Sequence, residues 1–339
     1  MHPCRVYRPA DVPPGALAGE TVAVVGYGHL GRAVALNLRD SGVKVRIGNR
    51  ADEYADQARA DGFEVVSIAA AAGDDIVWVL LPDEVIASVF SLEISPALRP
   101  GSAVAFSSGY CLAFGQARPP DTVDVLLVAP RMAGGGARDR YRSGEGFWAS
   151  VGIEADRSGR ARQRMLGLAD ALGALTRGAV EMTAAQEASL DLFIEQTVGP
   201  LIGTAIMVAF EVGVEAGIAP EALVLELYMS GEMETVFRSF RETGFFRASE
   251  DHGPTALFGG LTRALELDRA AMAERFRAVL EDIRAGAFAR RFQEEAGSGY
   301  PMLAIARAMI HGASPISDAE SRLRRLAPPP EPAAGAADP

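Results

Sequence analysis

Short apolar runs alternate with helical patterns over the first half of the chain. Each run ends at turn residues, which is typical of buried strands in a parallel sheet. The first run is followed by RAVALNLRDSG, whose apolar residues have helical spacing and which stops at Gly42. The pattern predicts an α/β domain over residues 1–182, with strands within 21–25, 43–49, 74–85, 101–109, 121–136 and 146–154.

The strand patterns fade from about Thr183, and we predict an all-α domain over residues 183–327. Its first helix is apolar almost all round, and we expect Gly199-Pro200 to break it and Gly217 to end it. Such a helix is buried on several sides, in a core or a subunit interface. Further helices are predicted within 219–244, 268–297 and 301–326, and the Pro/Ala-rich residues 328–339 are expected to form a disordered tail.

Three glycines follow the first predicted strand in the spacing G-x-G-x-x-G. Gly26 permits a tight turn, Gly28 lets the backbone approach a pyrophosphate, and Gly31 lets the helix pack on the strand. The phosphates would lie at the helix N-terminus. The triplet alone is a weak signal, and its alternative is a purely structural turn. Because it stands between a strand and a helix, we interpret it as the dinucleotide-binding loop of a Rossmann domain.

The ends of the other strands indicate where the rest of a dinucleotide would lie, since these loops line the ligand crevice of open α/β sheets. Asn49 and Arg50 suit a 2′-phosphate. Asp52 and Glu53 would repel one and could accept from free ribose hydroxyls, or could be ordinary acids at a helix start. We favour NADH over NADPH. The candidate cofactor-binding residues are Gly26, Tyr27, Gly28, His29, Leu30, Gly31, Asn49, Arg50, Glu53, Leu81, Pro82, Asp83, Ser107 and Gly109.

Composition narrows the classes of function. The 339 residues are 49% hydrophobic and 23% charged, as in soluble globular proteins. A net charge of -11 argues against nucleic-acid binding and against a basic membrane surface. Cys4 and Cys111 imply no disulfide framework. Because no signal-peptide core is found and no run approaches the roughly 18 apolar residues of a membrane span, we expect a cytoplasmic protein.

Two acids, Asp191 and Glu195, stand four apart in the apolar segment LDLFIEQ. On a helix this spacing places both carboxylates on one face. Unpaired buried carboxylates are costly, so they need cations or must stay protonated. There is no Lys or Arg between residues 179 and 237, which favours a hard metal ion as the partner. The alternative is that the pair is solvated and faces the cleft.

Several segments, taken in order, resemble the ketol-acid reductoisomerases of the short class, which serve branched-chain amino-acid synthesis. The resemblance implies an intertwined or knotted helical domain and a homodimer with the active site at its interface. It also implies that the paired acids bind two magnesium ions, that two later glutamates come from the partner subunit, and that NAD(P)H reduces a 2-keto acid formed by alkyl migration. The segments are TVAVVGYGHLGRAVALNLRDSG, VLLPDEV, FGQ, DLFIEQ, AGIAPEA and VLEDIRAGAFARRF, and the likeness runs from Val6 to Leu326.

The chain departs from the family pattern at several predicted site positions. Ser108 occupies the place of a histidine, and Arg131 that of a lysine. Glu226 and Glu232 are six apart instead of four, and on a regular helix they would not share a face unless a break at Gly231 brought them together. We therefore expect the second magnesium ion to be weakly held or absent. The remaining departures are Gly253 for a serine and Leu30 for a glutamine.

These departures predict an altered reaction, namely NAD(P)H-dependent reduction of a C=O or C=N group in a small keto or imino acid. Migration needs two metal ions and a polar network, whereas hydride transfer needs a bound cofactor and a positioned acceptor. The alternatives are the family's own magnesium-dependent conversion of acetolactate to dihydroxyisovalerate, and a non-catalytic nucleotide-binding relative. The candidate catalytic residues are Asp191, Glu195, Glu226, Ser108 and Arg131, and the candidate metal ligands are Asp191, Glu195, Glu226 and Glu232.

Overall fold

The computed structural model describes residues 4–251 and 253–328. The chain divides after Leu192 into two compact units, residues 1–192 and 193–339. The first is α/β and the second is all-helical, so the predicted fold class is confirmed. The domain boundary placed at residue 182 stays a prediction, and the predicted tail lies outside the described residues from residue 329 on.

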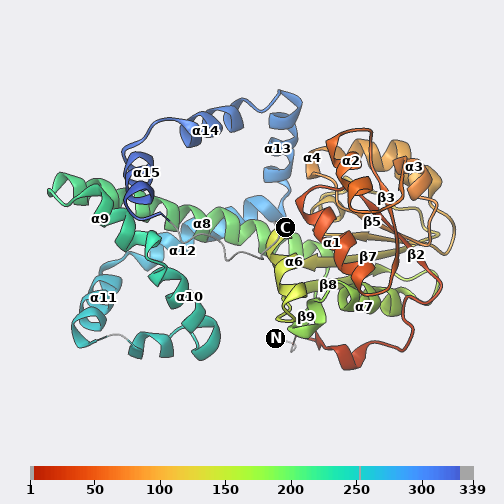
Figure 1. The fold of residues 1–339 in the computed structure, drawn as a ribbon, viewed down its shortest axis with the longest axis horizontal. Helices are drawn as coiled ribbons and strands as arrows, with labels where there is room; N and C mark the ends of the chain where they lie inside the picture. The colour runs from red at the N-terminus through yellow and green to blue at the C-terminus, as the bar shows by residue number, and fades with distance from the viewer. Residues whose placement is uncertain (1–3, 252, 329–339) are drawn as a thin grey trace. The chain divides into compact units, whose positions relative to one another are not determined.

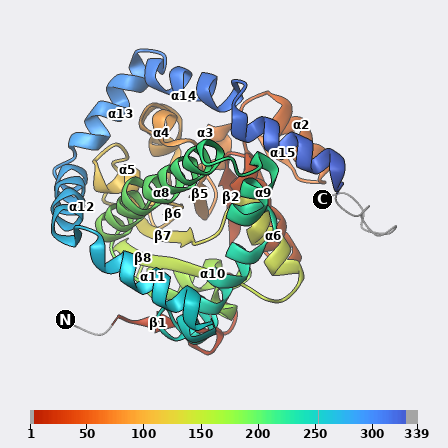
Figure 2. The same cartoon turned by 90° about the vertical axis from the view of Figure 1, so that its left-hand side faces the viewer.

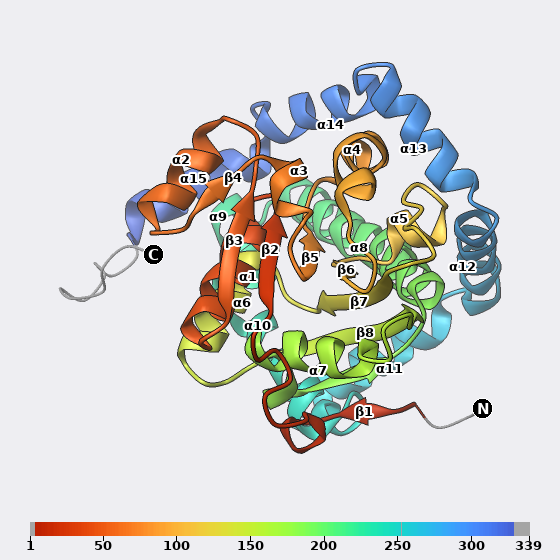
Figure 3. The ribbon, with the colours of Figure 1, turned by 90° about the vertical axis from the view of Figure 1, so that its right-hand side faces the viewer.

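The described part of the first unit contains a nine-stranded sheet in the order β1-β9-β8-β7-β6-β5-β2-β3-β4. Figure 3 shows the strands from β3 through β2, β5, β6 and β7 to β8 side by side. Strands β2 to β7 are parallel to one another. Strand β8 runs antiparallel to β7 and parallel to β9, and β1 is antiparallel to β9 at the edge. The strands are β1 (Val6–Tyr7), β2 (Thr21–Val25), β3 (Lys44–Gly48), β4 (Val65–Val66), β5 (Ile76–Val79), β6 (Ala103–Phe106), β7 (Asp124–Pro130), β8 (Trp148–Ala155) and β9 (Gly178–Glu181).

Five of these strands lie within the predicted segments, β8 extends one residue beyond its segment, and three strands were not predicted. Strands β1 and β4 have two residues each, which is too short for a period to be recognised. Strand β9 has the sequence GAVE, whose glycine and glutamate leave no apolar run. The helices of this unit are α1 (His29–Asp40), α2 (Glu53–Ala60), α3 (Ile68–Ala71), α4 (Asp83–Val89), α5 (Tyr110–Ala113), α6 (Gly134–Arg142) and α7 (Ala161–Ala171) (Figure 1).

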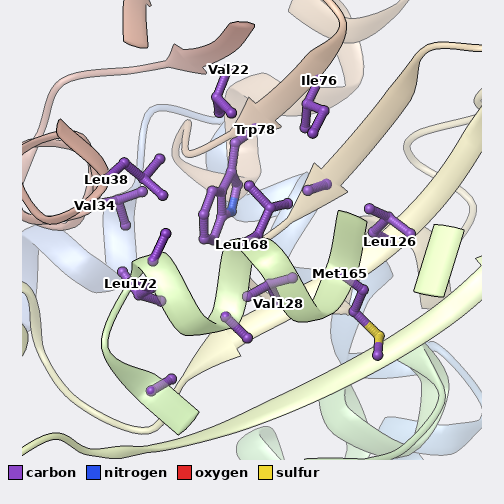
Figure 4. Packing of buried hydrophobic residues seen from close by; sticks show 14 of the residues in the cluster. Val22, Val34, Leu38, Ile76, Trp78, Leu126, Val128, Met165, Leu168 and Leu172 are labelled. Atoms are coloured by element: carbon purple, nitrogen blue, oxygen red, sulfur yellow. The ribbon is translucent and has the colours of Figure 1, made fainter. Parts of the chain in front are cut away.

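The core lies between the sheet and the helices α1 and α7. Figure 4 shows Leu168 of α7, and Leu172 directly after that helix, close to Leu38 of α1 and to Trp78 of β5, and all four are buried. The opposite face of the sheet is covered by α3, because a Cβ built on Gly48 would lie 2.6 Å from Ala71 of that helix. The two-sided burial explains why the strands are apolar runs without alternation.

The second unit consists of helices connected by short turns. Figure 2 shows α10 to α15 following one another in an open ring, whose last member returns to α9. A small core forms there from Phe210, Val224 and Ala319. The helices are α8 (Ala184–Glu215), which begins in the first unit, α9 (Pro220–Val224), α10 (Glu232–Thr243), α11 (Pro254–Glu266), α12 (Arg269–Arg284), α13 (Ala287–Gly297), α14 (Pro301–His311) and α15 (Pro315–Leu326).

Helix α8 corrects two expectations from the sequence. It runs unbroken from Ala184 to Glu215 with Pro200 inside it, so the predicted break at Gly199-Pro200 is wrong. A proline removes one backbone hydrogen bond, and the rest of a 32-residue helix retains its own. Among the described residues α8 is also long and apolar enough to cross a membrane, although one such helix is a weak indication. The segment has no uninterrupted apolar run of that length, because a few acids are scattered along the helix.

Candidate active site

The glycine loop has the geometry that a dinucleotide requires. Gly26 has φ +98°, and a Cβ there would lie 2.6 Å from the Leu80 carbonyl oxygen. A Cβ on Gly31 would lie 2.0 Å from the Gly26 carbonyl oxygen, so α1 starts in direct contact with the turn. Gly28 precedes the first residue of α1 and has open space beside it. The backbone N–H groups at the start of α1 therefore remain approachable by a phosphate.

A cleft of about 720 Å³ opens over this loop. Its walls come from the glycine loop, the end of β3, the start of α4 and the end of β6. The candidate residues that line it are Gly26, Tyr27, Gly28, His29, Leu30, Gly31, Asn49, Arg50, Leu81, Pro82, Asp83, Ser107 and Ser108. Asp52 and Tyr54 also line it, whereas Glu53 and Gly109 are not among the described residues that do.

The end of the cleft after β3 contains a compact polar cluster. Asp52 caps α2 by accepting from the N–H groups of Tyr54 and Ala55, both at 3.1 Å. Its other oxygen accepts from Arg50 Nε at 2.7 Å, and this bond is the main reason that the pKa of Asp52 is lowered. Asn49 donates to Asp52 at 2.8 Å. The cation that would suit a 2′-phosphate is therefore already paired with an acid.

Arg131, directly after β7, is held by two acids of α8. Its Nη1 donates to Asp191 Oδ1 at 2.7 Å, and its Nη2 pairs with Glu187. Glu187 is fully buried and also accepts from the Gly109 N–H at 2.6 Å. Burial raises the pKa of Glu187, while Arg131 and the Gly109 N–H oppose that shift. The Arg131 Nε–H is buried without a hydrogen-bond partner among the described residues.

This arrangement corrects the argument that Asp191 needs a metal ion because no Lys or Arg lies near it in the sequence. The segment around Asp191 has no cation of its own, but the fold brings Arg131 to it from 60 residues away. The prediction also missed Glu187, although Glu187, Asp191 and Glu195 follow one another at the same spacing of four along α8. Extending that spacing by one turn toward the N-terminus would have found it.

The hydroxyl groups of Ser107 and Ser108, the two serines after β6, differ in how fully they are hydrogen-bonded. Ser107 Oγ accepts from Trp78 Nε1 at 2.8 Å and donates to the Val128 carbonyl at 2.7 Å, so it ties neighbouring strands together. Ser108 Oγ accepts only a long bond of 3.3 Å from the Tyr110 N–H among the described contacts. Ser108 is therefore the hydroxyl that a ligand in the cleft could engage.

Asp83, at the start of α4, is a third acid close to this region. Burial raises its pKa to about 6, with smaller contributions in the same direction from Glu84, Glu187 and Asp191. Its contact is the Cys111 thiol, at 3.6 Å. Burial also raises the pKa of Cys111, so this cysteine stays a thiol and is no nucleophile. Asp83 can therefore carry a proton near neutral pH.

The predicted metal ligands do not form a cluster within the described part of one chain. Among the described residues there is no group of three or more His, Cys, Asp or Glu side chains placed to hold a metal ion. Asp191 and Glu195 supply the oxygen donors that magnesium prefers, but one oxygen of Asp191 already faces Arg131.

The segment with the later glutamates is not a regular helix. Glu226 lies in a π-helical turn (Leu225–Met229), and Gly231, with φ +80°, interrupts the chain before Glu232 begins α10. The break that the sequence left open is present, so the argument from six-residue helical spacing does not apply. Both glutamates are exposed in the single chain.

Comparison with known proteins agrees with these features. Residues 16–178 match the family model of the acetohydroxy acid isomeroreductase NADPH-binding domain, and residues 185–328 match that of the ketol-acid reductoisomerase C-terminal domain. The chain is 38% identical over 304 residues to ketol-acid reductoisomerase (NADP(+)) of Pyrobaculum arsenaticum, covering 88% of this chain and 92% of that protein. The corresponding protein of Caldivirga maquilingensis is 38% identical over 299 residues, covering 87% and 90%.

One solved structure is similar to this chain over nearly the whole length of both. An NADH-preferring ketol-acid reductoisomerase from an uncultured archaeon superimposes with a TM-score of 0.90 at 32% identity, covering 95% of this chain and 99% of that one. Both halves of the chain thus match the same family, in the order that the motifs predicted. The chain belongs to the ketol-acid reductoisomerase family of oxidoreductases.

Proposed function

We propose that this protein uses NAD(P)H to reduce the C=O or C=N group of a small keto or imino acid, in an active site altered from that of the family. The observation that supports this proposal is the 2.7 Å ion pair between Arg131 and Asp191. A guanidinium cannot give up its charge, so it competes with a metal ion for the same carboxylate. Reduction depends less on a metal ion than migration does.

The chain's own residues suffice for the binding and proton steps. NAD(P)H, when bound along the glycine loop, supplies the hydride. Arg131 uses two of its five N–H groups on Asp191 and Glu187, which leaves its other Nη N–H groups for the substrate carboxylate. Ser108 offers a hydroxyl to the reacting group, and Asp83 holds the proton that the reduced oxygen or nitrogen needs.

The test is NAD(P)H oxidation with a panel of 2-keto acids and cyclic imino acids beside acetolactate, each with and without magnesium. We expect turnover of at least one keto or imino acid, little dependence on magnesium, and no efficient conversion of acetolactate. Acetolactate turnover at about 1 per second or more would overturn the proposal. Cofactor binding without turnover of any acceptor would indicate a non-catalytic relative.

The family's own reaction is the second candidate. It is favoured by the four-residue spacing of Asp191 and Glu195 on α8, and by the break at Gly231, which removes the objection to Glu226 and Glu232. Two magnesium ions would then be held with glutamates of a second copy. Magnesium-dependent conversion of acetolactate in the panel above separates this candidate from the first.

The pH dependence should identify Asp83 as the proton donor. Because the acid form is needed and its pKa is about 6, we expect kcat/KM to be level below pH 6 and to fall at higher pH. Asp83→Asn should flatten this profile and cost about tenfold at pH 7.5, where only a small fraction of Asp83 is protonated. Glu84→Gln removes a charge that adds only a small part of this shift, so it should keep the falling profile and move its midpoint slightly toward lower pH. An unchanged profile in Asp83→Asn would exclude this role.

For the cofactor, we expect NADH to be preferred over NADPH, because Asp52 pairs with Arg50 and would repel a 2′-phosphate. Asp52→Ser keeps an N-cap for α2 and removes the charge, so it should shift the ratio of dissociation constants toward NADPH by about tenfold. Asp56→Asn, which breaks another exposed ion pair on the same helix, should leave the ratio unchanged. A wild type that prefers NADPH would contradict this prediction.

We also propose a homodimer that shares the active site. The helical unit exposes large apolar side chains, among them Phe246 at 84%, Phe258 at 72% and Ile310 at 72%. Burying such residues against a second copy would remove a large apolar surface from water. Sedimentation at low concentration should show a dimer that Phe258→Glu dissociates, whereas Leu92→Glu, at an exposed leucine of the first unit, should not. A stable, well-folded wild-type monomer would contradict the shared site.

A further inference from the structure

Helix α6 lies against α1, the helix that begins at the glycine loop (Figures 1 and 3). Its first residue, Gly134, is buried. A Cβ built on Gly134 would lie 2.3 Å from the His29 carbonyl oxygen and 2.9 Å from the Leu30 N atom. Both neighbours are backbone atoms of residues that line the cleft, and neither can turn away as a side chain could.

Side chains from the later turns of helix α6 also form hydrogen bonds with α1 and with the residue that follows α1. Arg138 donates to Asn37 at 2.9 Å and to Asp40 at 2.6 Å, and Tyr141 shares a 2.7 Å hydrogen bond with Ser41. Asn37 is itself buried and donates to the Leu172 carbonyl at 3.1 Å. Because these contacts hold the body of α6 in place, a bulkier first residue could not be relieved by moving the helix away. The start of α1 would have to shift instead.

We propose that Gly134 is a positioning residue for the dinucleotide, which sets the place of the His29 and Leu30 backbone through the N-terminus of α6. The inference rests on the proposed binding of NAD(P)H along the glycine loop. The glycine is needed for close approach and not for its own backbone conformation, since its φ is not in the left-handed region. Gly134 stands outside the G-x-G-x-x-G motif by more than 100 residues, so the motif alone does not reveal it.

The chain supplies a matched control in the next residue. A Cβ on Gly135 meets nothing within 4 Å, and Gly135 is exposed in the same helical turn. Gly134→Ala and Gly135→Ala therefore change the helix propensity equally and differ only in the clash. We expect Gly134→Ala to raise the dissociation constant of NADH by about tenfold or more, in line with the cost of overpacking, and Gly135→Ala to stay within about twofold.

The measurements are calorimetric titration of NADH and NADPH, thermal unfolding, and steady-state kinetics in which the cofactor and the acceptor are each varied. A positioning role predicts a raised cofactor KM with nearly unchanged kcat and acceptor KM in Gly134→Ala. If that variant does not fold, Arg138→Gln decides, since loosening α6 should weaken cofactor binding by about two- to fivefold. If Gly134→Ala folds and binds NADH with wild-type affinity, the inference is overturned. If Gly134→Ala does not fold, wild-type NADH affinity in Arg138→Gln overturns it. A wild type that binds neither dinucleotide would instead refute the proposed function.

Discussion

Replacing Arg131 with methionine is expected to lower kcat/KM by about two to three orders of magnitude, the usual effect of removing a preorganised donor from an active site. Arg131 forms ion pairs with both Glu187 and Asp191. Without it, the fully buried Glu187 must take up a proton or remain an uncompensated charge. The substrate carboxylate would also lose the donors that orient it. The measurement is NAD(P)H oxidation with the best acceptor of the panel.

Two further variants make this prediction specific. Arg140→Met removes an arginine of matching exposure, 29% against 28%, from a pair with Glu145, and activity should stay within about twofold. Arg131→Lys keeps the charge but lacks the fork that reaches both acids, so it should free Asp191 and make activity more dependent on magnesium. Arg131→Met with activity within threefold of the wild type would show that the ion pair has no role in the reaction.

Replacing Arg164 with methionine is expected to destabilise the first unit by about 3–5 kcal/mol, as is typical when one partner of a buried ion network is removed. Arg164 is 5% exposed, and it donates to Glu20 at 2.7 Å and to Asp124 at 2.8 Å. These contacts join α7 to the start of β7 and to the segment before β2. The substitution would leave both carboxylates buried without their shared cation.

The same network fixes the direction of the pH dependence. Burial alone would raise the pKa of Asp124, but hydrogen bonds from Ser158, the Arg157 N–H and Arg164 outweigh it, so the net pKa is lowered. A lowered folded-state pKa adds stability above the unfolded value of about 3.9, and this stability is lost as the pH falls through the folded value. The difference between wild type and Arg164→Met should therefore be larger at pH 7 than at pH 3.

Denaturant unfolding followed by fluorescence measures both effects. Arg157→Met, which breaks an ion pair with the almost fully exposed Asp121, should change the free energy of unfolding by about 0.5 kcal/mol or less. Equal unfolding midpoints for Arg164→Met and wild type at pH 7 would show that the ion network makes no net contribution to the free energy of unfolding. A larger difference at pH 3 than at pH 7 would contradict the assignment of the lowered pKa to this cluster.

The sequence by itself determined the features that depend on neighbouring residues. The apolar runs of β2, β5 and β6 and the glycine spacing before α1 are local patterns, because strand formation and a tight turn are decided within a few residues. The stacking of Asp191 and Glu195 follows from helical geometry alone. The family resemblance added the order of the motifs, which the comparisons confirmed.

Tertiary structure decided what depends on residues far apart in the chain. It brought Arg131 to Asp191 across 60 residues, and Gly134 to His29 across more than 100, through the packing of strand ends and helices on one sheet. Period and propensity act over a few residues, whereas burial and ion pairing are settled by which surfaces meet, and these surfaces form only when the whole sheet is assembled.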